Sequence, residues 1–325
     1  MDNAKIVADL RASNFVREKR LNKHISSFNF TSKAFYKQHW DEQTIRARGL
    51  FVGEDKEVVA RSFDKFFDLK VKDVSKISYP VTVTKKYNGF LGILSYDKYA
   101  DDLFIASKST NEGSFAEIFS KILFRKYLTY NEKIEEVKKF LKQNNCSLVF
   151  EVISVEHDPH FVKYKEDQCV LLACIRNEYK FAPYPREDLE AISVYCGFPL
   201  AERVCILKSF DELFNFLTYE VSQVQGEEGW VIQDSLNNMW KIKTEWYLNW
   251  KQARGLRDYV LHGLKETNDI NQIEEAVLYH TKFGKKFTKE FCHWLIEFCY
   301  THEIIDMPVI IDAWEHFPSH PQFLL

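Results

Sequence analysis

The feature that most constrains the fold is a β-branched stretch that leads into a glycine turn. Residues 81–84 alternate Val and Thr, and this alternation favours an extended strand. Asn88-Gly89 is a strong turn signal, and an apolar run begins at Phe90. The stretch therefore predicts a strand, a turn and a second strand. Lys86 is expected at the C-terminal end of the first strand. It would lie close to backbone that remains accessible because Gly89 has no side chain.

A lysine in this position has two interpretations, and the local sequence leaves both open. Most lysines are solvated surface charges, and K-x-x-G occurs by chance in many proteins. The other interpretation is a nucleophile, since an amine that is neutral can attack an electrophile. A nucleophilic lysine needs neighbouring cations that lower its pKa. The spacing selects Lys86, because the fourth residue counted from Lys85 is Asn88 and not glycine.

Charged residues of the required kinds follow along the chain, each on an expected strand or strand edge. In order they are Lys108, Glu151, Glu228 with Gly229, Lys241 and Lys243. Glu151 lies in the apolar strand expected over residues 147–155, where an unpaired buried carboxylate would cost too much free energy. We therefore expect Glu151 to face a cleft or to have a cationic partner. Lys241 and Lys243 project from one face of their strand, because side chains alternate.

Arginine, lysine and phenylalanine mark the region before the lysine turn. Residues 46–52 read as a strand that includes Arg48, residues 53–56 as a hairpin turn, and residues 57–63 as the partner strand. Lys65 and Phe67 follow within Asp-Lys-Phe-Phe-Asp. One interpretation places the two phenylalanines in the core and the charges in water. The other uses the same residues to bind a polyphosphate and a base.

The order of these motifs resembles that of the covalent nucleotidyltransferases, the superfamily of polynucleotide ligases and capping enzymes. Those enzymes carry K-x-x-G, then a glutamate, then E-G-x-V, then K-x-K. Three features that precede Lys86-Tyr87-Asn88-Gly89 narrow the resemblance to one group within this superfamily. They are Ala-Arg-Gly followed by an apolar strand, a second strand with arginine, and Lys-Phe-Phe. This pattern is similar to ATP-dependent RNA ligases of the phage T4 RNA ligase 1 type and to the ligase domain of fungal tRNA ligases. DNA ligases and capping enzymes generally lack the Lys-Phe-Phe element.

The resemblance implies a role for each candidate residue. Lys86 would be the nucleophile that forms lysyl-AMP, and Arg48 would hold the β- and γ-phosphates. The catalytic set would be Lys86, Lys241, Lys243 and Glu228. The ATP-binding set would be Arg48, Lys65, Phe67, Lys86, Gly89, Lys108, Glu151, Glu228, Gly229, Lys241 and Lys243. Mg²⁺, with Mn²⁺ as an alternative, would be held by Glu151 and Glu228, because Mg²⁺ shares its coordination shell with water and phosphate oxygens.

The expected fold is α+β with two domains. Residues 1–244 would form a nucleotidyltransferase domain of antiparallel sheets flanked by helices, and residues 1–45 read as short helices without a clear motif. Residues 245–325 would form a smaller all-α domain, because no strand-like run follows residue 244. Helical spacing is found at residues 246–264, 272–279, 287–299 and 309–314. This helical pattern does not resemble the OB-fold that DNA ligases and capping enzymes append.

Composition limits the partner and the compartment. The net charge is −3, so an RNA partner would need a local basic patch. Seven cysteines without C-x-x-C indicate a reducing, cytoplasmic location. Cys292 and Cys299, with His293 and His302, suggest zinc, but their spacing on one helix face favours core packing. The N-terminus has no signal-peptide pattern and no apolar run is long enough to span a membrane, so we expect a soluble protein.

The sequence therefore predicts an ATP-dependent RNA ligase that joins 3′-OH and 5′-phosphate RNA ends in RNA or tRNA repair. We expect a monomer. No kinase P-loop or phosphodiesterase H-x-T pair is found, so a separate kinase or phosphatase is expected to prepare the RNA ends. The alternatives are a DNA ligase, a GTP-dependent capping-type enzyme, or a non-catalytic protein that binds nucleotides or tRNA on the same scaffold.

Overall fold

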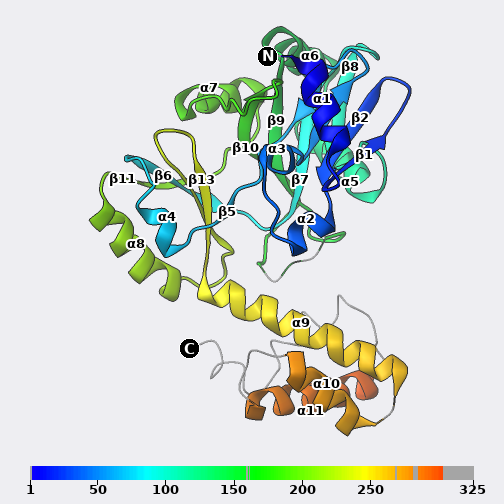
Figure 1. Cartoon of the computed structure of the whole chain (residues 1–325), viewed down its shortest axis with the longest axis vertical. Coiled ribbons are helices and arrows are strands. Elements are labelled where there is room, and N and C mark those ends of the chain that lie inside the picture. Colours follow the sequence, from blue (N-terminus) through cyan, green and yellow to red (C-terminus); the bar gives the residue numbers. More distant parts are fainter. Residues whose placement is uncertain (1, 159, 161, 268, 281–284, 303–325) are drawn as a thin grey trace. The chain divides into compact units, whose positions relative to one another are not determined.

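The structure is a computed structural model that describes residues 2–158, 160, 162–267, 269–280 and 285–302. The described residues form two compact units. The first unit lies within Met1–Asp158, Tyr164–Glu212 and Trp230–Ile242, and the second within Pro159–Lys163, Leu213–Gly229 and Lys243–Leu325. The expected domain boundary after residue 244 stays a prediction. The mixture of antiparallel sheets and helices, with a helical C-terminal part, confirms the expected α+β class (Figure 1).

The first sheet of unit one corrects our expectation for residues 1–45. Its antiparallel strands run in the order β1 (Val16–Arg20), β2 (Ile25–Phe30), β3 (Leu50–Gly53) and β4 (Val58–Arg61). Helices α1 (Asn3–Ala12), α2 (Ser32–Tyr36) and α3 (Glu42–Arg46) are present, but β1 and β2 were not predicted. The strand β2 lacks apolar alternation because both of its faces are covered, and its four residues from Ile25 to Phe28 are buried.

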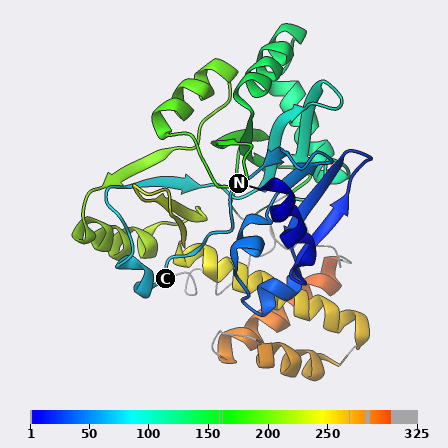
Figure 2. The same ribbon diagram turned by 45° about the horizontal axis from the view of Figure 1, so that its top comes forward.

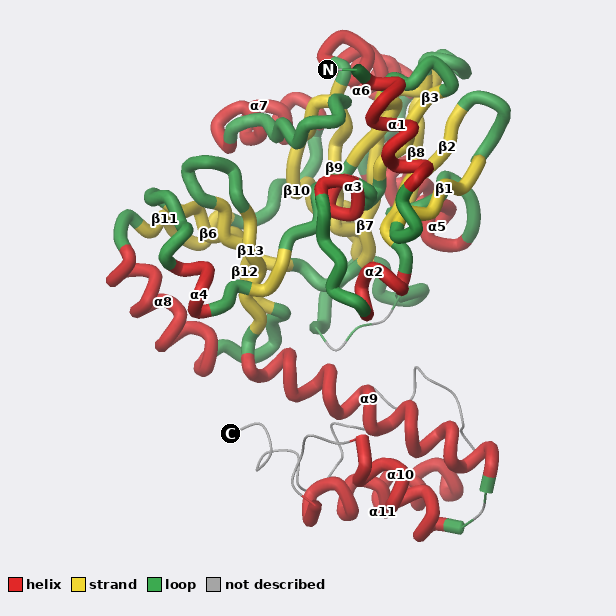
Figure 3. Tube along the Cα trace, in the orientation of Figure 1, coloured by secondary structure: helices red, strands yellow, loops and turns green. Residues whose placement is uncertain are grey.

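The second sheet has the order β10 (Gln168–Arg176), β9 (Cys146–Ile153), β7 (Phe90–Asp97) and β8 (Asp102–Ser107), and every pairing is antiparallel. The strands β7 and β9 confirm the expected strand that begins at Phe90 and the one expected over residues 147–155. Helices α5 (Ser114–Lys126), α6 (Asn131–Asn144) and α7 (Arg186–Cys196) cover one face (Figure 3). Phe119, Leu123 and Phe150 are fully buried between this face and the helices. Burial of each such side chain contributes about 1.5–3 kcal/mol.

The two sheets pack face to face. Their shared core contains Phe51 and Ala60 from the first sheet and Ile93, Phe104 and Ala106 from the second. On the outer face of the first sheet, α1 packs through the three buried residues Ile6, Val7 and Leu10. These two sheets of unit one therefore lie between α1 on one side and α5, α6 and α7 on the other, and Figure 2 shows the same elements from a second direction.

A third sheet of five strands holds the lysine turn. Its order is β11 (Arg203–Leu207), β6 (Val81–Lys86), β12 (Gly229–Gln233), β13 (Met239–Lys243) and β5 (Phe67–Asp68). The strands β6 and β7 thus belong to different sheets, and residues 87–89 cross from one sheet to the other. The strands β12 and β13 are joined by a turn in which the Asp234 carboxylate accepts hydrogen bonds from the backbone N–H groups of Leu236 and Asn238. Helix α4 (Val71–Val74) belongs to unit one, whereas helix α8 (Phe210–Gln223) begins in unit one and continues in unit two.

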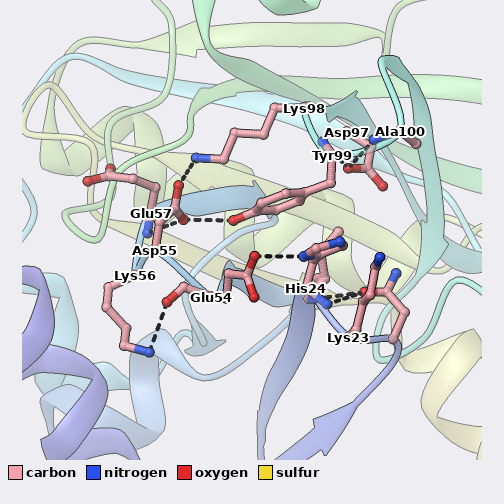
Figure 4. Close-up of polar contacts among 12 residues, drawn as sticks. Lys23, His24, Glu54, Asp55, Lys56, Glu57, Asp97, Lys98, Tyr99 and Ala100 are labelled. Carbon is pink, nitrogen blue, oxygen red and sulfur yellow. Dashed lines mark hydrogen bonds and ion pairs between the residues drawn. The ribbon is translucent and has the colours of Figure 1, made fainter.

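Three turns meet at one end of the two packed sheets (Figure 4). The Tyr99 hydroxyl donates to Asp55 Oδ1 at 2.9 Å, and its ring stacks on His24 with centroids 4.7 Å apart. His24 Nδ1 lies 2.7 Å from Glu54 Oε1. Burial, and then the Asp55 carboxylate, raise the pKa of Tyr99 to about 12. These contacts join the β1–β2, β3–β4 and β7–β8 turns.

The second unit is helical over its C-terminal part. Its helices α9 (Glu245–Glu266), α10 (Ile270–His280) and α11 (Lys285–His302) confirm three expected helical segments, whereas residues 309–314 lie outside the described residues. Helices α9 and α10 pack closely, since a Cβ on Gly263 would lie 2.8 Å from Ile273 Cγ1. Cys292 and Cys299 are buried on α11, which confirms core packing. Within the described segments, no helix combines the length and apolar character needed to cross a membrane.

Candidate functional site

The lysine turn is held through its backbone. The strand β6 ends at Lys86, whose half-buried Nζ donates to the Tyr87 carbonyl oxygen at 3.5 Å. The Asn88 N–H donates to the Tyr164 hydroxyl oxygen at 2.7 Å, and the Gly89 N–H donates to Glu151 Oε1 at 2.9 Å. Glu151 therefore fixes the loop that begins at Lys86, although 65 residues separate the two in sequence.

Glycine is required at position 89 because of the neighbouring strand β9. A Cβ at this position would lie 2.2 Å from the Val152 carbonyl oxygen, which is part of the strand backbone and cannot move aside cheaply. We expected Gly89 to admit a nucleotide. The structure gives a reason that does not depend on a ligand, namely that the turn lies directly against β9.

We expect Gly89→Ala to destabilise unit one by about 1–3 kcal/mol, as overpacking against rigid backbone does. Gly255→Ala is the matched control, because a Cβ at Gly255 on α9 would meet nothing within 4 Å. That control should be neutral or stabilising by about 0.5–1 kcal/mol, since alanine favours helix more than glycine. Urea unfolding of both variants measures the difference. Equal stabilities for Gly89→Ala and the wild type would contradict the close packing.

Strand alternation turns Glu151 away from the helices. Its neighbours Phe150 and Val152 pack toward α5, whereas Val149, on the same face as Glu151, packs against Phe63. On this face the Glu151 carboxylate is close enough to Arg48 for the two charges to interact. The expectation of a cationic partner for Glu151 is therefore confirmed.

Arg48 lies between α3 and β3, before the strand in which we expected it. Its Nη1 donates to Ser62 Oγ at 3.2 Å and to the Phe63 carbonyl oxygen at 3.5 Å. Burial lowers the pKa of Arg48, and the negative charges of Glu151 and Asp64 act in the opposite direction. Neutral oxygens hold the Arg48 guanidinium in place, and the nearby carboxylates favour its charged form. A charged guanidinium in this position can bind a further anion.

Lys65 and Phe67 contact Trp40, which is not among the site residues predicted from the sequence. Lys65 Nζ lies 4.0 Å from the centroid of the Phe67 ring and 5.2 Å from that of Trp40. The Trp40 and Phe67 rings meet edge to face, with centroids 5.2 Å apart. Burial, and then the cations Lys241 and Arg48, lower the pKa of Lys65 to about 8. The aromatic content of residues 35–40 was the signal that could have identified Trp40.

The lowered pKa of Lys65 gives a pH prediction. An unfolded lysine keeps a pKa of about 10.5, so between pH 8 and 10.5 the unfolded chain binds more protons at Lys65 than the folded chain does. The contribution of Lys65 to stability therefore rises with pH across this window and is least favourable below pH 8. We expect Lys65→Met to raise the melting temperature at pH 7 and to lose that advantage by pH 10. Thermal melts of both proteins at the two pH values test the sign, and a gain that grows with pH would contradict it.

Two further lysines complete the cationic group. Lys108 Nζ lies 5.5 Å from the centroid of the Phe30 ring, and burial, followed by the nearby Arg48, lowers the pKa of Lys108. The parallel pairing of β5 with β13 places Lys241 opposite Asp68, with Nζ 3.9 Å from Asp68 Oδ1. Unit one holds eight of the candidates, and pairwise interactions connect most of them: Gly89 with Glu151, Glu151 with Arg48, Arg48 with Lys65 and Lys108, and Lys65 with Phe67 and Lys241. The eighth is Lys86, which lies at the start of the turn that Glu151 fixes.

The remaining candidates belong to unit two. Glu228 is buried, and its Oε1 lies 3.8 Å from Lys243 Nζ. Lys243 also lies over the Tyr247 ring, 5.1 Å from its centroid. Gly229 has φ of +142°, a backbone conformation that favours glycine. The structure brings Glu228 and Lys243 together, whereas their place beside a nucleotide, and the metal roles of Glu151 and Glu228, stay predictions.

A lysine at a strand end, a glycine turn fixed by a glutamate, and cations connected to that glutamate through Arg48 are features of a covalent nucleotidyltransferase. Residues 46–251 match the RNA ligase family, and the chain belongs to this family. The tRNA ligase of Candida albicans is 25% identical over 338 aligned residues, which cover 85% of this chain and 39% of that protein. The chain thus spans about two fifths of the length of this relative.

Solved structures share the fold. An archaeal ATP-dependent RNA ligase has a TM-score of 0.54 and 14% sequence identity, with 90% of this chain and 75% of that chain covered. A putative ATP-dependent DNA ligase from Aquifex aeolicus has a TM-score of 0.53 and 13% identity, with 97% and 80% covered. At these identities the similarity concerns the fold alone.

Proposed function

We propose that this protein is an ATP-dependent RNA ligase that joins a 3′-OH end to a 5′-phosphate end through a lysyl-AMP and an RNA-adenylate. The observation that carries the proposal is the hydrogen bond from the Gly89 N–H to Glu151. It fixes the loop of the candidate nucleophile to the strand whose glutamate interacts with Arg48. Membership of the RNA ligase family supports the same assignment.

In the first step Lys86 Nζ would attack the α-phosphorus of ATP. A P–N bond forms, the P–O bond to the β-phosphate breaks, pyrophosphate leaves, and the amine gives up a proton. Lys241 and Lys243 would meet the α-phosphate from one face of β13, because they are two residues apart on the strand. Such a transfer depends mainly on position and on stabilisation of charge.

The residues of unit one fit a nucleoside triphosphate. Arg48 would bind the β- and γ-phosphates, and Lys108 adds positive charge near it. Lys65 and Phe67 would line the base pocket. The Asn88 side-chain Nδ2 is buried and has no hydrogen-bond partner among the described residues, so a ligand acceptor beside the turn would satisfy it.

Glu151 and Glu228 would hold the ribose or a divalent metal. A bound Mg²⁺, or Mn²⁺ in its place, would neutralise charge on the phosphate oxygens during transfer. The buried Glu228 is already paired with Lys243, so a metal at Glu228 would have to share that carboxylate. The proposal therefore requires Lys243 to exchange part of its interaction with Glu228 for one with phosphate.

In the later steps AMP passes from Lys86 to the 5′-phosphate of an RNA, and the 3′-hydroxyl of the other end then displaces AMP. We propose broken tRNA as a substrate, because the Candida relative is a tRNA ligase. A separate kinase or phosphatase would prepare ends that lack the required groups. The monomeric state and the cytoplasmic location stay predictions.

Intact-protein mass spectrometry tests the proposal. After incubation with ATP and Mg²⁺ the chain should be heavier by about 0.33 kDa, the mass of one adenylate on lysine. It should then seal a 3′-OH RNA to a 5′-phosphate RNA and convert AMP-lysine back to lysine. A mass gain with GTP instead of ATP would indicate a capping-type enzyme. Sealing of DNA but not RNA ends would indicate a DNA ligase, and no mass gain would overturn the proposal.

A further inference from the structure

The acidic chain contains a segment without acidic residues. The 22 residues from Lys19 to Trp40 include no Asp or Glu and contain five basic residues, namely Lys19, Arg20, Lys23, Lys33 and Lys37. The chain as a whole has a net charge of −3. Positive charge is therefore concentrated locally, as binding of a polyanion requires in such a protein.

Within this segment the short helix α2 exposes aromatic side chains. Phe35 is 50% exposed and Tyr36 is 81% exposed, with their rings edge to face at 5.9 Å. Ala34 is the one residue of α2 that is buried, and Lys33 and Lys37 are exposed beside the two rings. Exposed aromatic groups at such density mark an interaction site more often than an ordinary surface.

The ring cluster extends to the proposed nucleotide pocket. The Phe35 ring lies 6.4 Å from Trp40, and the Trp40 ring contacts Phe67 at 5.2 Å. On its other side, Lys33 Nζ lies 5.4 Å from the centroid of the Phe15 ring, which stacks on His39 at 4.0 Å. His39 Nε2 lies 3.0 Å from Asp41 Oδ2, so the carboxylate that adjoins this surface already has a partner.

We propose that this α2 surface, defined by Phe15, Lys33, Phe35, Tyr36, Lys37 and His39, binds unpaired nucleotides of an RNA next to the end that is joined. Aromatic rings stack on bases of any sequence, and the lysines would contact the phosphates. Single-stranded RNA fits better than a protein partner, because rings alternate with cations and lead to a site for a nucleotide. The inference rests on the proposed ligase function for the identity of the RNA end, but the binding itself can be measured without catalysis.

Fluorescence anisotropy with a 12-nucleotide single-stranded RNA, without ATP and at several KCl concentrations, tests the surface. The double variant Phe35→Ala/Tyr36→Ala should raise Kd by about tenfold or more, since stacking on both rings is lost. A plot of the logarithm of the association constant against the logarithm of the salt concentration has a negative slope. Lys33→Gln/Lys37→Gln should make that slope less steep by about 1.4, the value for two phosphate contacts on a single strand. A blunt RNA duplex should not respond to loss of the rings, because its bases are already stacked.

Matched variants elsewhere on unit one separate a local site from a general effect. Tyr130→Ala removes a tyrosine that is 71% exposed, and Lys121→Gln/Lys139→Gln removes two charges from exposed positions on α5 and α6. Both should leave the Kd for RNA unchanged. Unchanged binding by the α2 variants, or an equal loss in the controls, would overturn the inference. So would a wild-type dimer in sedimentation that Phe35→Ala/Tyr36→Ala dissociates. The wild-type mass gain with ATP reports separately on the ligase proposal.

Discussion

Lys86→Ala is expected to abolish the mass gain of about 0.33 kDa that the protein shows with ATP and Mg²⁺. No other amine in the turn has the same position, because Lys86 is the last residue of β6 and directly precedes the loop that Glu151 fixes. Lys86→Arg should fail as completely, since a guanidinium keeps its proton in proteins and cannot act as a nucleophile. Intact mass measured over time distinguishes a slow enzyme from an inactive one.

Lys85→Ala is the matched control for this prediction. Lys85 is the neighbouring residue on the same strand, its side chain therefore projects from the opposite face, and its Nζ lies 5.8 Å from the centroid of the Tyr87 ring. This variant should still gain the adenylate. If the mass gain persists in Lys86→Ala but disappears in Lys85→Ala, the nucleophile is Lys85 and not Lys86. A gain that persists in both single variants would refute the assignment. Circular dichroism confirms that each variant is folded.

The strands around the lysine turn could be predicted because their signals are local. Alternating residues from Val81 to Thr84, the Asn88-Gly89 turn and the apolar run from Phe90 each act over a few neighbouring positions. The helix α7 carries equally local signals, since Pro185 precedes it and Gly197 ends it in the left-handed conformation.

The contacts that assemble the candidate site are non-local, and for this reason the sequence did not predict them. The Gly89 N–H and Glu151 are 62 residues apart, and the parallel pairing of β5 with β13 joins residues 67–68 to residues 240–241. Trp40 lies in a polar segment where strand or helix periodicity gives no information about its contact with Lys65. The strands β1 and β2 were missed because β1 is a charged edge strand and β2 is covered on both faces.

Replacement of Glu151 is expected to have the second largest effect, and two variants separate its two roles. Glu151→Ala removes the acceptor for the Gly89 N–H and the negative charge near Arg48. Loss of this partly buried, charged acceptor costs about 1–3 kcal/mol, so the melting temperature should fall. The rate of adenylate formation should fall by about 10²–10³, because the loop with Lys86 is no longer fixed and a charged group of the site is lost.

Glu151→Gln keeps an amide oxygen that can accept from the Gly89 N–H, but it has no charge for Arg48, the ribose or a metal. If charge is essential, this variant should melt close to the wild type and still lose most of its activity. Glu156→Ala is the control, since Glu156 is an exposed acid shortly after β9 and should change neither quantity. Full activity in Glu151→Gln would limit Glu151 to positioning the loop and would contradict its assignment as a metal ligand. A low melting temperature in Glu151→Gln would show instead that the charge of Glu151 stabilises the partly buried Arg48, since removal of one partner leaves the other charge uncompensated.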